Sequence, residues 1–315
     1  MITEGTWSTA IAFYSWVKKT IASRYPVTGY ISSRESKSIL IERTGRILVR
    51  VENHCIGLKK APHIPWLKAF YPDHDEFLIS LPDILGMNGA WQWYKNGIRY
   101  GSLKETLHPF YGVYFPTRTG HLDMFDKWLC RNRGMFSSAT DIGTGCGILS
   151  FIMARHGIEK IHATDINPNA VYSTRKEIER FGLTGKIIVE QLPLFGSQNK
   201  ARGLTVFNPP WIPGSCTNNI DRGIYYENGF FTSFFNEAKK IITGGSYLVM
   251  VFSNFAIEAG ITDRNPIEME ISSGSDFLLS EKITAKVNER TSGKKSWIND
   301  IRQRENTELW IMKRI

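Results

Sequence analysis

The chain has 315 residues, of which 42% are hydrophobic and 22% charged, and its formal net charge is +9 with a pI near 9.3. This length can bury one substantial core and a smaller one, so two domains are expected. The longest apolar runs are far below the roughly 20 residues of a membrane span, and the first residues lack a signal-peptide pattern, so a cytoplasmic protein is expected.

The four cysteines are scattered through the chain with no paired spacing and no histidine at ligand spacing, which predicts free thiols and no metal site. The positive charge suits a polyanionic partner such as nucleic acid. It is a weak signal, because the Lys and Arg residues are spread along the chain.

The first 108 residues predict an accessory domain of mixed α and β structure. Residues 5–25 favour a helix, and residues 38–53 alternate like two strands around Thr44-Gly45. Asn96-Gly97 lies between aromatic-rich segments and predicts a two-residue hairpin. Residues 59–77 are rich in proline and charge, which is typical of a connection.

From about residue 120 strands and helices alternate, which predicts a parallel sheet covered by helices. Helices are expected at residues 121–132, 147–157, 167–182 and 230–243. Strands are expected at residues 137–143, 160–166, 186–192, 203–208, 245–253, 276–289 and 307–315, the last two with no helix between them.

A glycine-rich turn, "TDIGTGCGILS", joins the first of these strands to a helix. Asp141 ends the strand, and Gly143, Thr144, Gly145 and Gly147 form a turn on which a nucleotide-like cofactor can lie against bare backbone. We expect Asp141 and these turn residues to bind the cofactor. The spacing differs from Gly-x-Gly-x-x-Gly, so a nicotinamide or flavin cofactor fits poorly.

The following strand ends at Asp165-Ile166, where the carboxylate can accept both hydroxyls of a ribose. The alternative is that Asp165 only caps the next helix. The glycine turn upstream favours ribose binding.

In this order and spacing, "DIGTGCG", "ATDINPNAV" and "FNPPW" resemble the class I S-adenosylmethionine-dependent methyltransferases. The resemblance is to the branch that contains the HemK-type glutamine methyltransferases and the "small domain" rRNA and tRNA base methyltransferases. It covers roughly residues 110–315. It implies S-adenosylmethionine as cofactor and a Rossmann-like, seven-stranded α/β domain over residues 109–315, with one antiparallel strand.

Two segments of this domain match the family's pattern only in part. "YGVYFPTRTGHLDMF" is similar to the segment that folds over the cofactor, which implies a cofactor contact for Arg118, but His121 stands where the family usually has Glu. After the third strand relatives carry an Asp for the adenine, whereas Pro193 stands here with Glu190 and Gln191 nearby. Backbone N–H groups of Leu192 or Leu194 are the other candidates for that contact.

The run Asn208-Pro209-Pro210-Trp211 follows a buried strand and suits methyl transfer to a conjugated nitrogen. The Asn208 side-chain oxygen and the Pro209 carbonyl can each accept one N–H of a planar amino group, and Trp211 offers a face for stacking. Asn208 is also expected beside the cofactor. A Pro-rich turn that merely ends a strand is the alternative.

The acceptor stays open between a nucleic-acid base, with RNA favoured, a protein glutamine and a small metabolite. A long loop after Trp211 carries Tyr225, Tyr226 and Phe230 and could form a lid or acceptor wall. A second loop, residues 289–306, carries four basic residues around Trp297, namely Lys294, Lys295, Arg302 and Arg304. This pattern fits either a loop that contacts RNA or an ordinary solvated loop. A binding protein without turnover is the remaining alternative.

Overall fold

The computed structural model describes residues 4–216, 219–287 and 297–315, without the side chain of Asn219. The chain divides into two compact units, Met1–Lys95 and Asn96–Ile315. This division lies thirteen residues before the boundary at 108/109 that the sequence suggested. The reason is that Tyr100 and Leu107 are buried in the core of the second unit.

The first unit combines helices with a small antiparallel sheet of order β2-β1-β3. Its elements are α1 (Trp7–Arg24), α2 (Tyr30–Thr44), β1 (Leu48–Glu52), β2 (Cys55–Ile56), α3 (Trp66–Phe70), β3 (Glu76–Ser80) and α4 (Leu81–Asn96), which ends one residue past the division. The predicted first helix is present as α1, where the Thr6 side chain caps the helix by accepting from Thr9 N–H.

Two predictions for this region are wrong. The Thr44-Gly45 turn joins α2 to β1 rather than two strands, because the Ile-Leu-Ile run belongs to a helix that packs against α1. The Asn96-Gly97 pair ends α4 instead of forming a hairpin. Gly97 has φ +69°, and a positive φ serves a helix stop as well as a type I′ turn, so the same residues carry both signals.

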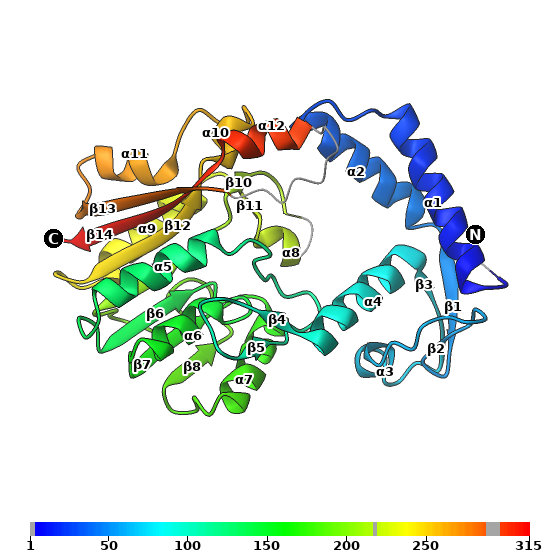
Figure 1. Cartoon of the computed structure of the whole chain (residues 1–315), viewed down its shortest axis with the longest axis horizontal. Helices are drawn as coiled ribbons and strands as arrows, with labels where there is room; N and C mark the ends of the chain where they lie inside the picture. The colour runs from blue at the N-terminus through cyan, green and yellow to red at the C-terminus, as the bar shows by residue number, and fades with distance from the viewer. Residues whose placement is uncertain (1–3, 217–218, 288–296) are drawn as a thin grey trace. The chain divides into compact units, whose positions relative to one another are not determined.

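The second unit is built on a seven-stranded sheet of order β13-β14-β12-β9-β6-β7-β8, in which only β14 runs antiparallel to its neighbours (Figure 1). Its sheet strands are β6 (Ser138–Ile142), β7 (Lys160–Thr164), β8 (Ile187–Glu190), β9 (Leu204–Phe207), β12 (Tyr247–Ser253), β13 (Phe277–Lys286) and β14 (Asn306–Arg314). The predicted seven strands and their single antiparallel member are confirmed.

Helices and two short strand pairs surround this sheet. The helices are α5 (Gly120–Arg131), α6 (Ile148–Arg155), α7 (Pro168–Arg180), α8 (Asn219–Arg222), α9 (Phe230–Ile241), α10 (Phe255–Glu258), α11 (Pro266–Ser272) and α12 (Trp297–Arg304). The short pairs are β4 (Ile98–Arg99) with β5 (Thr106–Leu107), and β10 (Ile212–Pro213) with β11 (Tyr225–Tyr226). The four helices predicted from residue 120 onward are confirmed as α5, α6, α7 and α9.

Both faces of the central strands are buried, which explains their continuous apolar sequence. In β12, Val249 and Val251 point into the core under α5, α6 and α7, while Leu248, Met250 and Phe252 point into the core with α9. The strands β6, β7 and β9 are parallel neighbours, so their carboxyl ends lie at the same edge of the sheet. The loops that follow these strands therefore lie close together.

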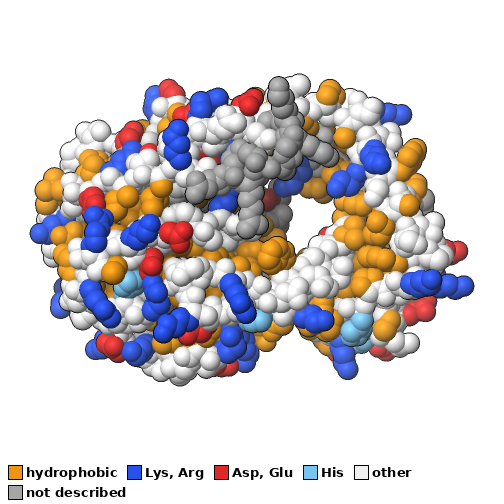
Figure 2. Space-filling model, in the orientation of Figure 1, with side chains coloured by type: hydrophobic (Ala, Val, Ile, Leu, Met, Phe, Trp, Pro, Cys, Tyr) orange, Lys and Arg blue, Asp and Glu red, His pale blue; other side chains and the backbone are white. Residues whose placement is uncertain are grey.

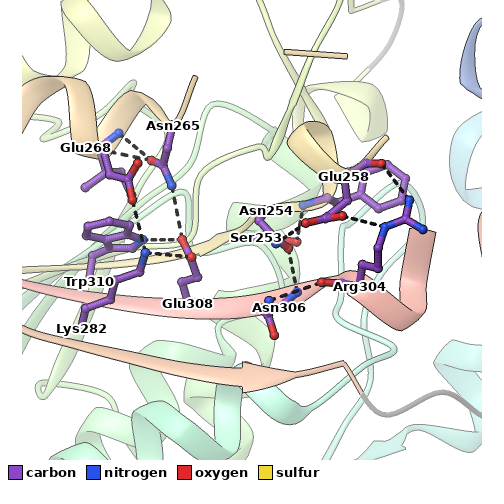
Figure 3. A network of polar contacts seen from close by, with 12 residues as sticks. Ser253, Asn254, Glu258, Asn265, Glu268, Lys282, Arg304, Asn306, Glu308 and Trp310 are labelled. Carbon is purple, nitrogen blue, oxygen red and sulfur yellow. Dashed lines mark hydrogen bonds and ion pairs between the residues drawn. The ribbon is translucent and has the colours of Figure 1, made fainter. Parts of the chain in front are cut away.

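The two final strands do have a helix between them, α12, so that prediction is wrong. The helix has only eight residues, is mostly polar and buries only Ile301, so in sequence it resembles a solvated loop. Near the start of β14, Glu308 accepts from Trp310 Nε1 at 2.9 Å and pairs with Lys282 at 2.9 Å (Figure 3). This contact joins β13 to β14 across their register.

Among the residues that the structure describes, no helix combines the length and apolar character needed to cross a bilayer.

Candidate functional site

The glycine turn between β6 and α6 has the backbone geometry that only glycine adopts without strain. Gly143, Gly145 and Gly147 have φ of +64°, +54° and +83°. A Cβ on Gly145 would lie 3.0 Å from the backbone oxygen of Tyr114. The turn therefore presents bare backbone at the start of α6, which favours a ligand with polar or anionic groups.

Asp141 holds this turn from behind and does not line the cavity in front of it. Its Oδ2 accepts from Thr144 Oγ1 at 2.7 Å, from Ser150 Oγ at 2.6 Å and from Ser150 N at 3.1 Å. The side chain is fully buried, and this burial raises its pKa to about 6. In this structure Asp141 supports the turn, and its contact with the cofactor stays a prediction.

Asp165 lies at the carboxyl end of β7 and faces the cavity. Its Oδ2 accepts from Gly145 N–H at 2.9 Å, and its Oδ1 accepts from Asn167 N–H at 2.8 Å. Asn167, not Asp165, is the N-cap of α7, since its side chain accepts from Asn169 N–H at 3.0 Å. The alternative reading of Asp165 as the helix cap is therefore not what the structure shows.

A first cavity of about 520 Å³ opens at this edge of the sheet. It is lined by the glycine turn, by Asp165 and Ile166 after β7, and by Asn208 and Pro210 after β9. Thr144 also lines it, and its backbone N–H is bonded to Thr164 O at 2.9 Å. The volume is in the range of small-molecule sites.

The third side of the first cavity is formed by Leu192, Pro193 and Leu194, which follow β8. Glu190 is turned away, since it accepts from Ser197 Oγ and N–H and lies 2.8 Å from His162 Nε2. Those hydrogen bonds from Ser197 lower the pKa of Glu190. Of the residues predicted to contact the adenine, residues 192–194 line the first cavity and Glu190 and Gln191 do not, and the contact itself stays a prediction.

The aromatic residues of the loop after Trp211 also reach the first cavity. Tyr225, Tyr226 and Phe230 line it, as the sequence suggested for a lid or wall. Tyr114 and Pro116 line it as well, and both belong to the segment that the sequence predicted to fold over the cofactor. Their segment is tied down by long-range bonds that no local pattern encodes, such as Asn169 Nδ2 to Tyr111 O at 2.9 Å and Tyr100 OH to Pro116 O at 2.9 Å.

Asn208 lies where the first cavity meets a second one of about 350 Å³. Its side-chain oxygen is buried and has no hydrogen-bond partner in the structure. The peptide bonds of Pro209 and Pro210 are trans, so the run is not a cis-proline turn. An unpartnered buried acceptor costs free energy, and such a cost is expected where a ligand supplies the missing donor.

Trp211 is held by the core and lines the second cavity rather than the first. Its Nε1 donates to Val251 O at 3.3 Å, and its ring meets His121 edge to face with centroids 5.9 Å apart. Pro209 lines the second cavity too. The indole is therefore held in place and forms a fixed part of the wall of the second cavity.

Arg118 and His121 also belong to the second cavity and not to the first. Arg118 Nη1 lies 3.3 Å from Glu305 Oε2, and its contact with the cofactor stays a prediction. His121 is only 3% exposed, and its Nε2 is buried without a hydrogen-bond partner. Burial lowers the pKa of His121 to about 4, so the imidazole is neutral near pH 7.

This pKa shift makes a prediction for stability. His121 binds its proton near pH 6.5 in the unfolded chain but near pH 4 when folded, so its contribution is complete above pH 6.5 and is lost as the pH falls toward 4. His121→Phe should remove this loss and gain roughly 2 kcal/mol of unfolding free energy relative to the wild type between pH 7 and pH 5.

The measurement is urea unfolding of both proteins at the two pH values. The raised pKa of Asp141 acts in the opposite direction but is present in both proteins, so it cancels from the comparison. A difference between the two proteins that does not change with pH would contradict the neutral, buried state of His121.

The structure shows no grouping of three or more His, Cys, Asp or Glu residues suited to a metal ion within its described ranges.

Comparisons with known proteins agree with this architecture. Residues 115–206 match the family described as ribosomal protein L11 methyltransferase (PrmA). A Methanocaldococcus jannaschii protein named as an N5-glutamine methyltransferase is 29% identical over 39% of this chain and 59% of its own length. The ribosomal protein L11 methyltransferase of Dechloromonas aromatica is 32% identical over 29% of this chain and 32% of its own. The chain thus spans less than two thirds of either relative.

Solved structures of similar fold include a ribosomal protein L11 methylase from Lactobacillus delbrueckii subsp. bulgaricus, with TM-score 0.44, 14% identity, and coverage of 64% of this chain and 82% of that one. The M. jannaschii tRNA m1G37 methyltransferase has TM-score 0.43, 20% identity, and coverage of 64% and 51%. Sheet order, glycine turn and family match together make the second unit a Rossmann-like domain of the class I S-adenosylmethionine-dependent methyltransferase type.

Proposed function

We propose that this protein is an S-adenosylmethionine-dependent N-methyltransferase that acts on a planar, conjugated amino group. The observation that carries the proposal is the buried, unpartnered side-chain oxygen of Asn208 at the junction of the two cavities. An acceptor N–H would satisfy this oxygen, and nothing else in the described site does.

The first cavity fits the cofactor by the chemistry of its walls. Asp165 supplies a carboxylate for the ribose hydroxyls, the glycine turn supplies bare backbone, and Leu192 to Leu194 supply an apolar edge for the adenine. S-adenosylmethionine supplies a sulfonium-bound methyl group, whose bond electrons return to sulfur as the new nitrogen–carbon bond forms.

The second cavity is the proposed acceptor side. Asn208 Oδ1 and the Pro209 carbonyl can each accept one N–H of the amino group, which aims the nitrogen lone pair along the line toward the first cavity. The methylated nitrogen becomes acidic and loses one proton to solvent. Positioning, rather than a strong general base, is the catalytic contribution of this chain.

An RNA base is the acceptor we place first, because a net charge of +9 favours a polyanion. The positive side chains are spread over the visible face of the second unit and mixed with acidic ones rather than gathered in one block (Figure 2). A protein glutamine is the second candidate, since the M. jannaschii relative is named for that activity. Both carry the same planar amino group.

The test is mass spectrometry of total RNA and of the proteome from cells with and without the protein. A methylated base that disappears from the RNA supports the first acceptor, and a methylated glutamine that disappears supports the second. No lost methyl mark in either fraction, together with no S-adenosylmethionine binding in calorimetry, would contradict the proposal.

RNA binding makes a separate prediction about salt. If phosphates are contacted, the logarithm of the binding constant should fall linearly with the logarithm of salt, by roughly 0.7 per phosphate neutralised on a single strand. Reversing the charge of Lys294 and Lys295 together should flatten this slope and leave S-adenosylmethionine affinity unchanged. Both lysines lie outside the described residues.

Two other basic residues of the same segment are already paired with carboxylates, Arg304 with Glu258 at 2.9 Å and Arg302 with Glu305. A titration of binding to total cellular RNA that is flat, or that the double reversal does not change, would place protein glutamine ahead of RNA.

A further inference from the structure

His121 is a described polar side chain of the second cavity whose burial the proposed chemistry leaves unexplained. It stands in the first turn of α5, is 3% exposed, lines the second cavity, and keeps Nε2 buried with no hydrogen-bond partner. A residue that served only to pack against Trp211 would do so at lower cost as Phe, because an unpartnered buried nitrogen destabilises the fold. The buried, unpartnered Nε2 therefore indicates that a ligand atom supplies its hydrogen-bond partner.

The charged groups around this cavity determine what kind of ligand it can accept. Arg118 and Arg302 line it, and both charges act on the buried Tyr114 hydroxyl, whose pKa burial raises to about 12. The buried carboxylate of Glu305 lies against both guanidinium groups. Among the described residues that line the cavity there are two guanidinium groups and no carboxylate, which makes the cavity unfavourable for an ammonium group.

These walls are fixed in place by the segment that follows β12. Ser253 Oγ donates to Glu305 Oε1 at 2.7 Å. Asn306 N–H donates to Asn254 Oδ1 at 2.7 Å, and Arg304 Nε donates to Glu258 Oε2 at 2.9 Å (Figure 3). The cavity wall is thus preorganised, so binding does not have to order it.

Resting on the proposed function, we propose that His121 is a positioning residue for the methyl acceptor: its Nε2–H donates to the acceptor atom that neighbours the amino group held by Asn208. That atom is the ring nitrogen of an aminobase or the carbonyl oxygen of a carboxamide. Asn208 then accepts a hydrogen bond from the amino group, and His121 donates one to the neighbouring atom on the same planar edge of the methyl acceptor. An alkyl ammonium lacks the acceptor atom and meets the positive wall, so it is excluded.

The imidazole suits this task because it is neutral. A cationic histidine would repel the neighbouring guanidinium groups and the sulfonium of the cofactor, whereas the neutral ring donates one N–H without adding charge. The bond from His121 fixes the acceptor at a second atom of its planar edge, beside the amino group that Asn208 and the Pro209 carbonyl hold.

The kinetic test compares His121→Phe with His121→Gln, each assayed with total RNA and with proteome from cells that lack the protein. Phe preserves the packing on Trp211 but cannot donate, whereas the Gln amide nitrogen can reach the place of Nε2. We expect kcat/KM to fall by about ten- to a hundredfold in H121F and to recover largely in H121Q, with S-adenosylmethionine affinity and Tm at pH 7 not reduced. Full activity of H121F, or equal loss in both variants with a lowered Tm, would overturn the assignment.

A second readout does not depend on turnover. The imidazole ¹⁵N resonance that H121F lacks identifies His121 among the seven histidines. It is followed while 9-methyladenine, propionamide or propylammonium is added, with and without S-adenosylhomocysteine. A saturable shift with 9-methyladenine or propionamide and none with propylammonium supports the role. The compound that binds more tightly indicates whether the methyl acceptor is a nucleic-acid base or a carboxamide. No shift with either, or an equal shift with propylammonium, would overturn it.

The two proposals fail separately. If calorimetry shows no cofactor binding and no methyl transfer occurs, the proposed function fails, whatever the resonance does. If methyl transfer proceeds but His121 neither shifts nor matters to kcat/KM, only the role of His121 fails.

Discussion

Replacing Asn208 with alanine should lower methyl transfer by roughly two to three orders of magnitude while S-adenosylmethionine affinity stays nearly unchanged. The reason is that its buried oxygen has no partner within the protein, so its hydrogen bond is available to the acceptor alone. Loss of one positioning hydrogen bond in a transition state has an effect of this size. Single-turnover kinetics and calorimetry on the same preparation measure the two quantities.

Two controls sharpen this result. Asn208→Asp keeps acceptor oxygens at the same place and should retain more activity than the alanine variant. Asn132→Ala removes an amide that donates to Trp128 O at 2.8 Å at the end of α5, away from both cavities, and should be fully active. An equal loss of cofactor affinity and turnover in Asn208→Ala would mean that this residue serves the cofactor instead.

Replacing Gly145 with valine should reduce S-adenosylmethionine affinity about a hundredfold or more. A Cβ there would lie 3.0 Å from Tyr114 O, and the φ of +54° is strained for a branched side chain, so the turn must move. Asp165→Ala should weaken binding to a similar extent, because it removes both the ribose acceptor and the oxygen bonded to Gly145 N–H at 2.9 Å.

Gly134→Val is the matched control for strain. Gly134 also has a positive φ, +80°, but a Cβ there meets nothing within 4 Å. It should lower the free energy of unfolding and leave cofactor affinity unchanged. Wild-type affinity in both Gly145→Val and Asp165→Ala would remove the first cavity as the cofactor site, and NAD binding in its place would mean that the protein binds a nicotinamide cofactor after all.

Much of the second unit could be predicted because its signals are local. Strand, glycine turn and helix follow one another within residues 138–155, and each conformation depends on residues a few positions away. The first unit was predicted less well because its signals are ambiguous. Asn96-Gly97 encodes a positive φ, but only packing decides whether a helix stops there or a hairpin turns.

The sequence by itself determined the mostly parallel sheet and the glycine turn, since both follow from short motifs and buried apolar runs, and it singled out Asp165 and Asn208 as predicted site residues. The tertiary structure alone decided that Asp141 supports the turn from behind and that Arg118 faces Glu305, 187 residues away in sequence. It also decided that His121 is buried beside Trp211. Hydrogen bonds and burial between residues so far apart depend on how the elements pack, and no periodicity or spacing within one segment records that packing.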